Sequence, residues 1–180
     1  MSSFQKVCEI DVSAMKAEME SIADRFGEIP LRTFDGSPHE ESTDLWLRYC
    51  PVEEVHKDGP IECEWYPLAW TLPCTINVIM NLHRITGGDL GGILVTKLPK
   101  GGQIKPHVDK SWHSDNHRKF YVPVKNGKGA KFCFEDGVIE PEEGEVYEFD
   151  NSIPHWVEND SDDERIAMIV CVEKESCHLQ

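Results

Sequence analysis

A histidine and an aspartate two positions apart, His107 and Asp109, place the strongest constraint on this chain. In an extended strand, residues i and i+2 point to the same face, about 7 Å apart along the chain, so both side chains can contact one metal ion. A second histidine would complete the two-histidine, one-carboxylate triad that leaves coordination positions open on ferrous iron. His155 can supply it, and Arg165 follows ten residues later, at the start of an apolar run. We therefore predict a metal site formed by His107, Asp109 and His155.

The length of 180 residues suits one domain with a hydrophobic core and is short for two. We expect a single domain over residues 1–180. In this interpretation, residues 1–72 hold an N-terminal helix and an aromatic-rich segment on the substrate side, and residues 73–172 form the jelly-roll core with the metal site. The sequence has no apolar run of about 18 residues or more and no signal-peptide pattern after Met1. These features predict a soluble cytoplasmic protein.

The formal net charge is −15, from 18 basic and 33 acidic residues. Such a charge disfavours nucleic acid and anionic membranes as partners. The two signs are separated, because Lys97 to Lys131 is basic and Glu135 to Glu164 is acidic. The stretches can neutralise each other as neighbours in a sheet, and the basic one can also draw small anions to the metal. Seven scattered cysteines without a C-x-x-C pair argue against a disulfide framework and a zinc knuckle.

Short strand-like segments separated by turn signals fill the second half of the chain. Asn126-Gly127, Asp136-Gly137 and Pro141 to Gly144 mark turns between segments that alternate apolar and polar residues. Earlier patterns predict a helix near the N-terminus and a second one from about Thr71 to Gly87. Residues 110–118 are predicted to be a polar loop. The pattern indicates a mainly β protein with flanking helices, and a double-stranded β-helix (a cupin-like jelly roll) fits it best.

Other histidines are weaker candidates for metal binding. His39 and His56 lie in polar, loop-like sequence without a partner at a useful spacing. His113 and His117 lie close enough to the predicted triad to be alternative ligands, and Asp115 is two residues from both. Neither repeats the strand geometry of the His107 motif, because the composition around them predicts a loop.

A cation and two hydroxyls near the triad in sequence suggest what else the site binds. The guanidinium of Arg165 can form a bidentate salt bridge with the far carboxylate of a dicarboxylate. Tyr121, in the strand after the metal loop, and Thr96, in the strand before it, carry hydroxyls that could assist. Structural roles are the alternatives: Arg165 could pair with the acidic run Asp162 to Glu164, and a strand Tyr or Thr is usually packing.

These motifs together resemble the aspartyl/asparaginyl β-hydroxylase-like branch of the Fe(II)/2-oxoglutarate dioxygenases. The resemblance covers about Pro73 to Val172 and rests on three blocks: Leu98 to Gly102 before Pro106 to Asp109, Gly144 to Ser152 before His155, and Arg165 after it. It implies that His107, Asp109 and His155 bind Fe(II). It further implies that Arg165 binds the C5 carboxylate of the cosubstrate 2-oxoglutarate, with help from the Thr96 hydroxyl.

The resemblance also implies a reaction in which O₂ and 2-oxoglutarate yield succinate, CO₂ and a hydroxylated product. The expected substrate is an unactivated C–H bond of an amino-acid side chain, free or in a peptide or protein, or of a small metabolite. The chain departs from the family where Lys119-Phe120-Tyr121 replaces a frequent Arg-x-His, and we recognise no family motif in its first seventy residues. Two other functions fit the residues: a cupin-like metalloenzyme that does not use 2-oxoglutarate, and a non-catalytic jelly-roll binding domain.

Overall fold

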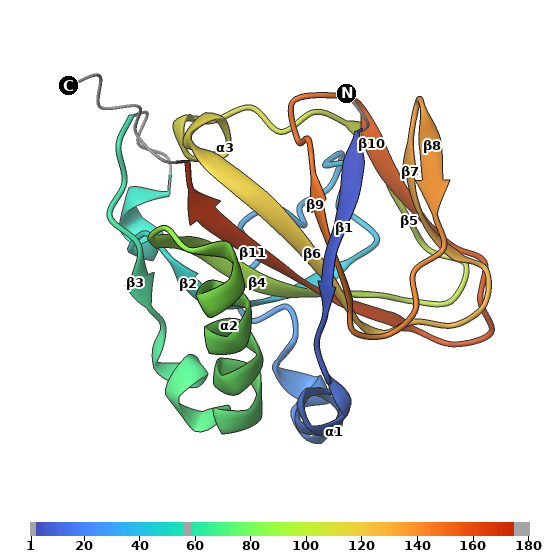
Figure 1. Ribbon diagram of the computed structural model, residues 1–180, viewed down its shortest axis with the longest axis horizontal. Coiled ribbons are helices and arrows are strands. Elements are labelled where there is room, and N and C mark those ends of the chain that lie inside the picture. The colour runs from blue at the N-terminus through green and yellow to red at the C-terminus, as the bar shows by residue number, and fades with distance from the viewer. Residues whose placement is uncertain (1–2, 56–58, 175–180) are drawn as a thin grey trace.

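The computed structural model describes residues 3–55 and 59–174, in which two β-sheets face each other (Figure 1). The histidine at position 56, weighed above, lies outside the described residues. The strands are β1 (Phe4–Glu9), β2 (Thr43–Tyr49), β3 (Glu64–Trp65), β4 (Leu90–Leu98), β5 (Gln103–His107), β6 (His117–Lys125), β7 (Ala130–Phe134), β8 (Gly137–Ile139), β9 (Glu145–Phe149), β10 (His155–Asn159) and β11 (Arg165–Glu173). The helices are α1 (Ser13–Ser21), α2 (Pro73–Thr86) and α3 (Trp112–Asn116), with short 3₁₀ helices η1 (Ala23–Arg25), η2 (Val52–Glu54) and η3 (Pro67–Thr71).

Within the described residues, the larger sheet has seven strands in the order β1-β9-β6-β11-β4-β2-β3, and the smaller has four in the order β5-β10-β7-β8. Neighbouring strands pair antiparallel throughout both sheets. Helices α1 and α2 cover one face of the larger sheet, and the smaller sheet covers the other (Figure 1). The mainly β jelly roll with flanking helices, predicted from the spacing of strands and turns, is confirmed.

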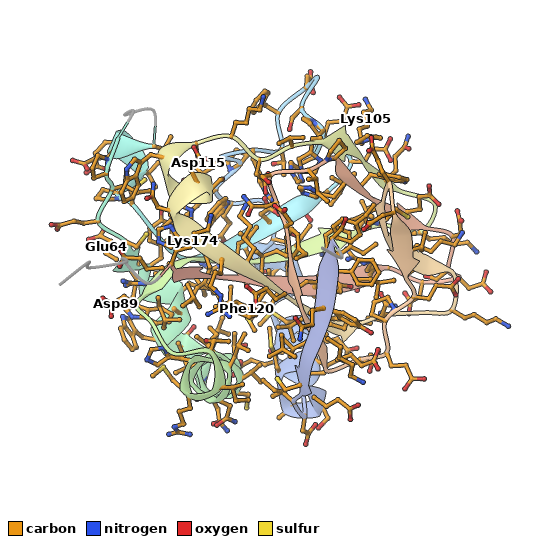
Figure 2. All side chains as sticks on the ribbon, turned by 45° about the horizontal axis from the view of Figure 1, so that its top comes forward. Glu64, Asp89, Lys105, Asp115, Phe120 and Lys174 are labelled. Carbon is orange, nitrogen blue, oxygen red and sulfur yellow. The ribbon has the colours of Figure 1, made fainter. Side chains whose placement is uncertain are left out.

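The alternation of side chains along each strand separates two hydrophobic layers. On β6, Phe120 joins the layer between the larger sheet and the helices (Figure 2), while Tyr121 joins the layer between the two sheets. On β11, Met168 and Ala167 divide in the same way. Every second side chain on the central strands therefore faces the smaller sheet. The layer between the two sheets, here called the inter-sheet layer, holds the site described below.

The segment before α2 contributes strands β1, β2 and β3 to the larger sheet. Strand β1 pairs with β9, and β2 pairs with β4. Residues 30–42, here named the cap loop, lie beside the edge strand β5 and accept hydrogen bonds from it. The Lys105 amide donates to the Pro38 carbonyl over 2.9 Å, and the Gln103 amide donates to Glu41. Because an edge strand presents unpaired backbone groups, these bonds fix the cap loop beside the inter-sheet layer.

The stretch predicted as a polar loop after Asp109 contains helix α3, so that prediction was wrong over Trp112–Asn116. The Ser111 hydroxyl accepts a hydrogen bond from the Ser114 amide over 3.0 Å, which is a helix N-cap that outweighs the polar composition. His113 and His117 are buried, with stacked rings 3.9 Å apart. The Gly92 amide donates to His113 Nε2. The pair therefore packs against β4 at Gly91 and Gly92.

Charges that are separated in the sequence meet in the fold, as expected. Basic residues of the Lys97 to Lys131 stretch pair with acidic residues that follow Glu135: Lys100 with Asp162, Lys125 with Asp163, and Lys131 with Asp160. The cysteines in the described part of the chain are free thiols. None of the helices in this part of the chain combines the length and the apolar composition that a membrane span requires.

Candidate active site

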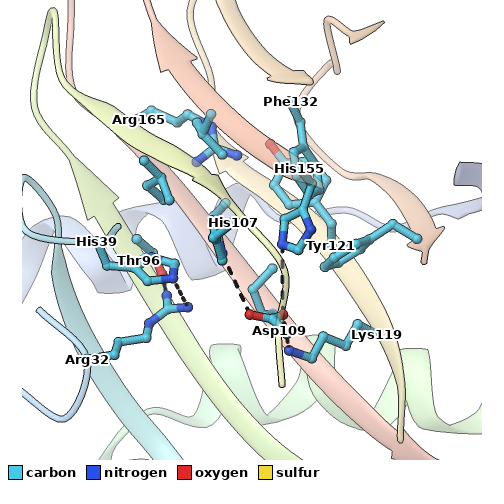
Figure 3. Close-up of a pocket in the computed structure, with 15 residues that line it drawn as sticks. Arg32, His39, Thr96, His107, Asp109, Lys119, Tyr121, Phe132, His155 and Arg165 are labelled. Atoms are coloured by element: carbon cyan, nitrogen blue, oxygen red, sulfur yellow. Dashed lines mark hydrogen bonds and ion pairs between the residues drawn. The ribbon is translucent and has the colours of Figure 1, made fainter. Parts of the chain in front are cut away.

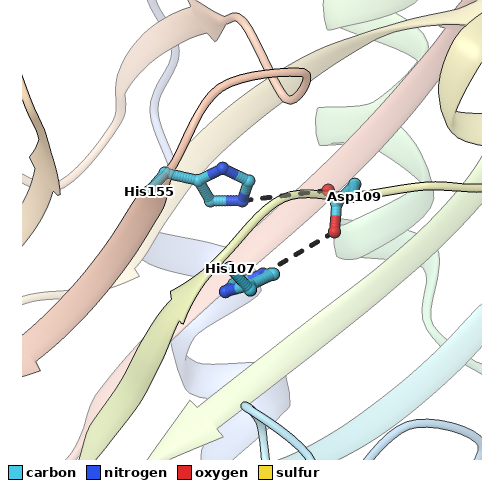
Figure 4. A group of neighbouring side chains, drawn as sticks. All are labelled: His107, Asp109 and His155. Carbon is cyan, nitrogen blue, oxygen red and sulfur yellow. Dashed lines mark ion pairs between the residues drawn. The ribbon is translucent and has the colours of Figure 1, made fainter.

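His107, Asp109 and His155 converge in the inter-sheet layer (Figure 4). His107 ends β5, His155 begins β10, and the two are directly paired across these antiparallel strands, so their ring centroids lie 4.4 Å apart. Asp109 follows β5 by two residues, and its amide donates to the Asn151 carbonyl. The three residues offer one ligand atom each, and these atoms all lie within 4.8 Å of one another. Strand pairing and the i, i+2 spacing thus place two imidazoles and one carboxylate around one point.

Backbone carbonyls orient both histidine rings. The Nδ1 of His107 lies 2.8 Å from the Lys105 carbonyl, and the Nδ1 of His155 lies 2.9 Å from the Ile153 carbonyl. A carbonyl only accepts, so each Nδ1 carries a proton, and in the neutral form of each ring Nε2 keeps its lone pair. The two Nε2 atoms lie 3.6 and 3.8 Å from the carboxylate oxygens of Asp109. The two Nε2 atoms therefore flank the Asp109 carboxylate, so all three groups can bind one metal ion.

Lys119, at the start of β6, donates a hydrogen bond to Oδ2 of Asp109. Burial raises the pKa of Asp109, but the charge and hydrogen bond of Lys119 outweigh it and hold that pKa well below its ordinary value. Burial also lowers the pKa of His155. The site therefore holds an ionised carboxylate and a neutral imidazole, the protonation states that bind a metal cation.

The three residues line a cavity of about 50 Å³ that opens to solvent. Arg165 and Tyr121 line the same cavity (Figure 3). Arg165 is 2% exposed, its guanidinium carbon lies 5.1 Å from the centre of the Tyr121 ring, and it has no ion pair among the described residues. The Nε of Arg165 and the hydroxyl of Tyr121 are buried without a hydrogen-bond partner. The acidic run before Arg165, which was considered as its structural partner, pairs instead with lysines on the surface, as described above.

Thr96 lines the cavity on β4, but its hydroxyl is engaged by neighbouring residues. It donates to Asp44 over 2.9 Å and accepts from Arg32 over 2.7 Å. Arg32 belongs to the cap loop and makes two further hydrogen bonds to the fully buried Asp44 carboxylate. The free hydroxyl that the sequence suggested at Thr96 therefore belongs to a three-residue network.

Three polar residues of the cavity were given no role in the site from the sequence: Arg32, His39 and Lys119. His39 was interpreted as a polar loop residue, yet it is buried and its ring lies edge-on to that of His107, 4.6 Å away. Contacts distant in sequence bring in the two cap-loop residues, and no local pattern indicates them. Lys119 could have been predicted from the sequence, because it lies two residues before Tyr121 and therefore on the same face of β6.

The residues present fit Fe(II) and 2-oxoglutarate. Two imidazole nitrogens and one carboxylate suit ferrous iron, and their placement on one side leaves other positions open. A buried guanidinium without a counterion costs free energy that a carboxylate would offset. Arg165 provides such a guanidinium in the same cavity, next to an unpaired hydroxyl.

Solved structures share this architecture. A protein of the 2OG-Fe(II) oxygenase family from Burkholderia pseudomallei aligns with a TM-score of 0.60 and 13% identity, over 88% of this chain and 77% of that one. A prolyl-4-hydroxylase from Pseudomonas putida aligns with a TM-score of 0.56 and 16% identity, over 97% and 94% of the two chains. The viral collagen prolyl hydroxylase of Paramecium bursaria Chlorella virus-1 gives 0.55 and 12%, over 95% and 96%. At these identities the similarity defines a class of fold, the double-stranded β-helix.

The family follows from the sequence itself. Residues 11–175 match the model of the aspartyl/asparaginyl β-hydroxylase family, and this match covers most of the chain. The chain therefore belongs to that family and is a 2-oxoglutarate-dependent hydroxylase that uses Fe(II) and O₂. A search of curated proteins gave no match.

Proposed function

We propose that the protein hydroxylates an unactivated C–H bond of an amino-acid side chain, free or in a peptide or protein, or of a small metabolite, and releases succinate and CO₂. The observation that carries the proposal is the buried, unpaired Arg165 in one cavity with the His107, Asp109 and His155 cluster. A dicarboxylate cosubstrate accounts for both features together. The named activities of two structural relatives, both prolyl hydroxylases, support an amino-acid side chain as the target.

In this proposal His107, Asp109 and His155 hold Fe(II), and their backbone and Lys119 partners fix them in place. Bound Fe(II) supplies the redox chemistry that couples decarboxylation of 2-oxoglutarate to oxygen transfer from O₂. The chain's own contribution is to position the groups that react. The carboxylate of Asp109 stays ionised beside Lys119, and each histidine keeps its Nε2 lone pair directed away from its backbone carbonyl.

Arg165 and Tyr121 would bind the C5 carboxylate of 2-oxoglutarate. The guanidinium donates in a fork, and burial raises the pKa of Tyr121, so its hydroxyl keeps the proton that it would donate. Apolar side chains around them exclude water from this end of the cavity and strengthen the salt bridge: Ile104, Phe132, Phe149, Val157, Ala167 and Ile169. We assign Thr96 the positioning of Arg32, because its hydroxyl hydrogen is committed to Asp44.

The test is consumption of 2-oxoglutarate with Fe(II) and O₂, measured as succinate and CO₂ formed. We expect turnover in the wild type and none in Asp109→Ala or His155→Ala, with the circular dichroism spectrum unchanged. Asp162→Ala is a matched control, because Asp162 is a fully exposed surface aspartate. Full turnover in either triad variant would contradict the proposal. Metal binding without any use of 2-oxoglutarate would favour a cupin-like metalloenzyme, and ligand binding that survives both substitutions would favour a binding domain.

A further inference from the structure

The cap loop adds a second arginine to the cavity, away from Arg165. Figure 3 shows the guanidinia of Arg165 and Arg32 on different sides of His107. The two arginines differ in their partners. Arg165 has no ion pair in the described part of the chain, whereas Arg32 is held by Asp44 and Thr96. A role for Arg165 toward the cosubstrate thus leaves Arg32 without an assigned function.

Arg32 keeps hydrogen-bonding capacity after its structural contacts. Its Nε and Nη2 donate to Asp44, and Nη2 also donates to Thr96. Nη1 has one contact, at 3.5 Å from Nε2 of His39. A guanidinium has five N–H groups, so Nη1 has capacity for an added acceptor. Asp44 and Thr96 thus fix the side chain while leaving one end of the fork available.

His39 supplies a second donor without a partner. Because Arg32 can only donate toward Nε2, the proton lies on Nδ1, which is buried without a hydrogen-bond partner. His39 also packs against the ring of His107. The cap loop therefore places two hydrogen-bond donors with spare capacity, Nη1 of Arg32 and Nδ1 of His39, beside the proposed iron ligands.

The charges of the site give a reason for these donors. Arg32, Lys119 and Arg165 are three cations, and Asp44 and Asp109 are two carboxylates, so the protein contributes one net positive charge. Fe(II) and the 2-oxoglutarate dianion cancel each other. The loaded site keeps one positive charge in a half-enclosed cavity, where uncompensated charge costs free energy. A substrate with one negative group would balance it.

We propose that Arg32 is a specificity-determining residue that binds a carboxylate of the substrate, with His39 as a supporting donor. This inference rests on the proposed function. Carboxylate is the chosen chemistry because a fixed guanidinium edge recognises that planar anion. The group has two sources among amino-acid substrates: the α-carboxylate of a free amino acid, or an acidic side chain within a peptide.

The experiment measures binding to the protein loaded with Fe(II) and 2-oxoglutarate without oxygen, so that no turnover occurs. Calorimetry uses two sets of probes: the free L-amino acids, and the blocked tripeptides acetyl-Ala-Asp-Ala-amide and acetyl-Ala-Glu-Ala-amide. The neutral peptide acetyl-Ala-Asn-Ala-amide is the matched comparison. Binding by the first set identifies an α-carboxylate, and binding by the acidic peptides identifies a side-chain carboxylate.

The decisive variant is the double substitution Arg32→Gln with Asp44→Asn, which removes both charges of the buried pair and leaves no carboxylate unpaired. We expect it to weaken binding of the carboxylate probe at least 10-fold while the visible band of the iron-bound 2-oxoglutarate is retained. Arg32→Lys, which keeps the cation opposite Asp44 and loses the fork, should weaken it less. Arg25→Gln, at an exposed arginine paired with Glu28, is the control and should leave binding unchanged.

Three results would overturn the role of Arg32. The first is an unchanged affinity for the probe in the double variant, and the second is a wild type that binds no carboxylate probe at all. The third is a wild type that binds the neutral and acidic peptides equally and binds no free amino acid. A purely structural Arg32 would instead lower the unfolding temperature and the cosubstrate affinity together. Failure of the proposed function would give a different result, because the visible band would then be missing from the wild type itself.

Discussion

Lys119 donates a hydrogen bond to the Asp109 carboxylate, and the same carboxylate lies 3.6 Å from Nε2 of His107. One oxygen of Asp109 is therefore oriented by a cation of β6 while the other faces a histidine of β5. A ligand held in this way is fixed before metal arrives. Supporting groups around metal ligands typically change affinity by about 10- to 100-fold when they are removed.

Lys119→Met is predicted to weaken Fe(II) or Mn(II) binding by about 10-fold or more, because Asp109 loses the partner that orients it. Metal titration followed by calorimetry measures the change. Lys125→Met is the matched control on the same strand, since Lys125 pairs with Asp163 outside the cavity. Unchanged or tighter metal binding in Lys119→Met would show that the lysine does not support the ligand.

Arg165→Gln is predicted to raise the dissociation constant of 2-oxoglutarate by about 100-fold, because a charge-assisted, bidentate contact is lost. Metal affinity should change little, since Arg165 contacts none of the three proposed ligands. Equilibrium binding of 2-oxoglutarate to the Mn(II)-loaded protein measures this, with the exposed Arg84→Gln as control. Equal cosubstrate affinity in the wild type and Arg165→Gln would remove the proposed role of the guanidinium.

Tyr121→Phe is predicted to separate stability from binding. The Tyr121 hydroxyl is buried without a partner, so its removal should leave the free energy of unfolding unchanged or increase it. Binding of 2-oxoglutarate should weaken by about 5-fold, the value of one ordinary hydrogen bond. Thermal unfolding and calorimetry give the two numbers. Loss of stability together with intact cosubstrate binding would assign the hydroxyl a packing role alone.

His113 is predicted to make stability depend on pH. Burial, reinforced by His117, lowers its pKa from 6.5 to about 3. As pH falls below 6.5, the unfolded chain binds a proton that the folded chain does not take up until about pH 3. The free energy of unfolding should therefore fall by up to about 1.4 kcal/mol per pH unit across that window. Denaturant unfolding between pH 7.5 and 4.5 measures the slope, which should be shallower in His113→Gln. An equal slope in both proteins would contradict the assignment.

The sequence predicted the parts of the site that depend on local geometry. His107 and Asp109 share a face because of their i, i+2 spacing, and the strand and turn pattern predicted the jelly roll that pairs His107 with His155. Arg32 could not be predicted in this way. It reaches the cavity through a hydrogen bond to Thr96, 64 residues away, and no pattern near it signals that contact.

The stretch that holds His113 shows the opposite error. Its polar composition predicted a loop, but the Ser111 cap starts a helix, and burial against Gly92 makes both histidines structural. Composition describes average exposure and is silent on the tertiary contacts that decide it. The sequence signal for such a site is the cap residue, which favours a helix start even in a short polar segment.

The most direct measurement of the central claim is anaerobic titration of the purified protein with Fe(II) and 2-oxoglutarate, followed by visible absorption. The proposed site predicts a weak charge-transfer band from the chelated complex in the wild type, and its absence in Asp109→Ala. If the wild type forms no band and binds no 2-oxoglutarate, the assignment of His107, Asp109, His155 and Arg165 to iron and cosubstrate is wrong.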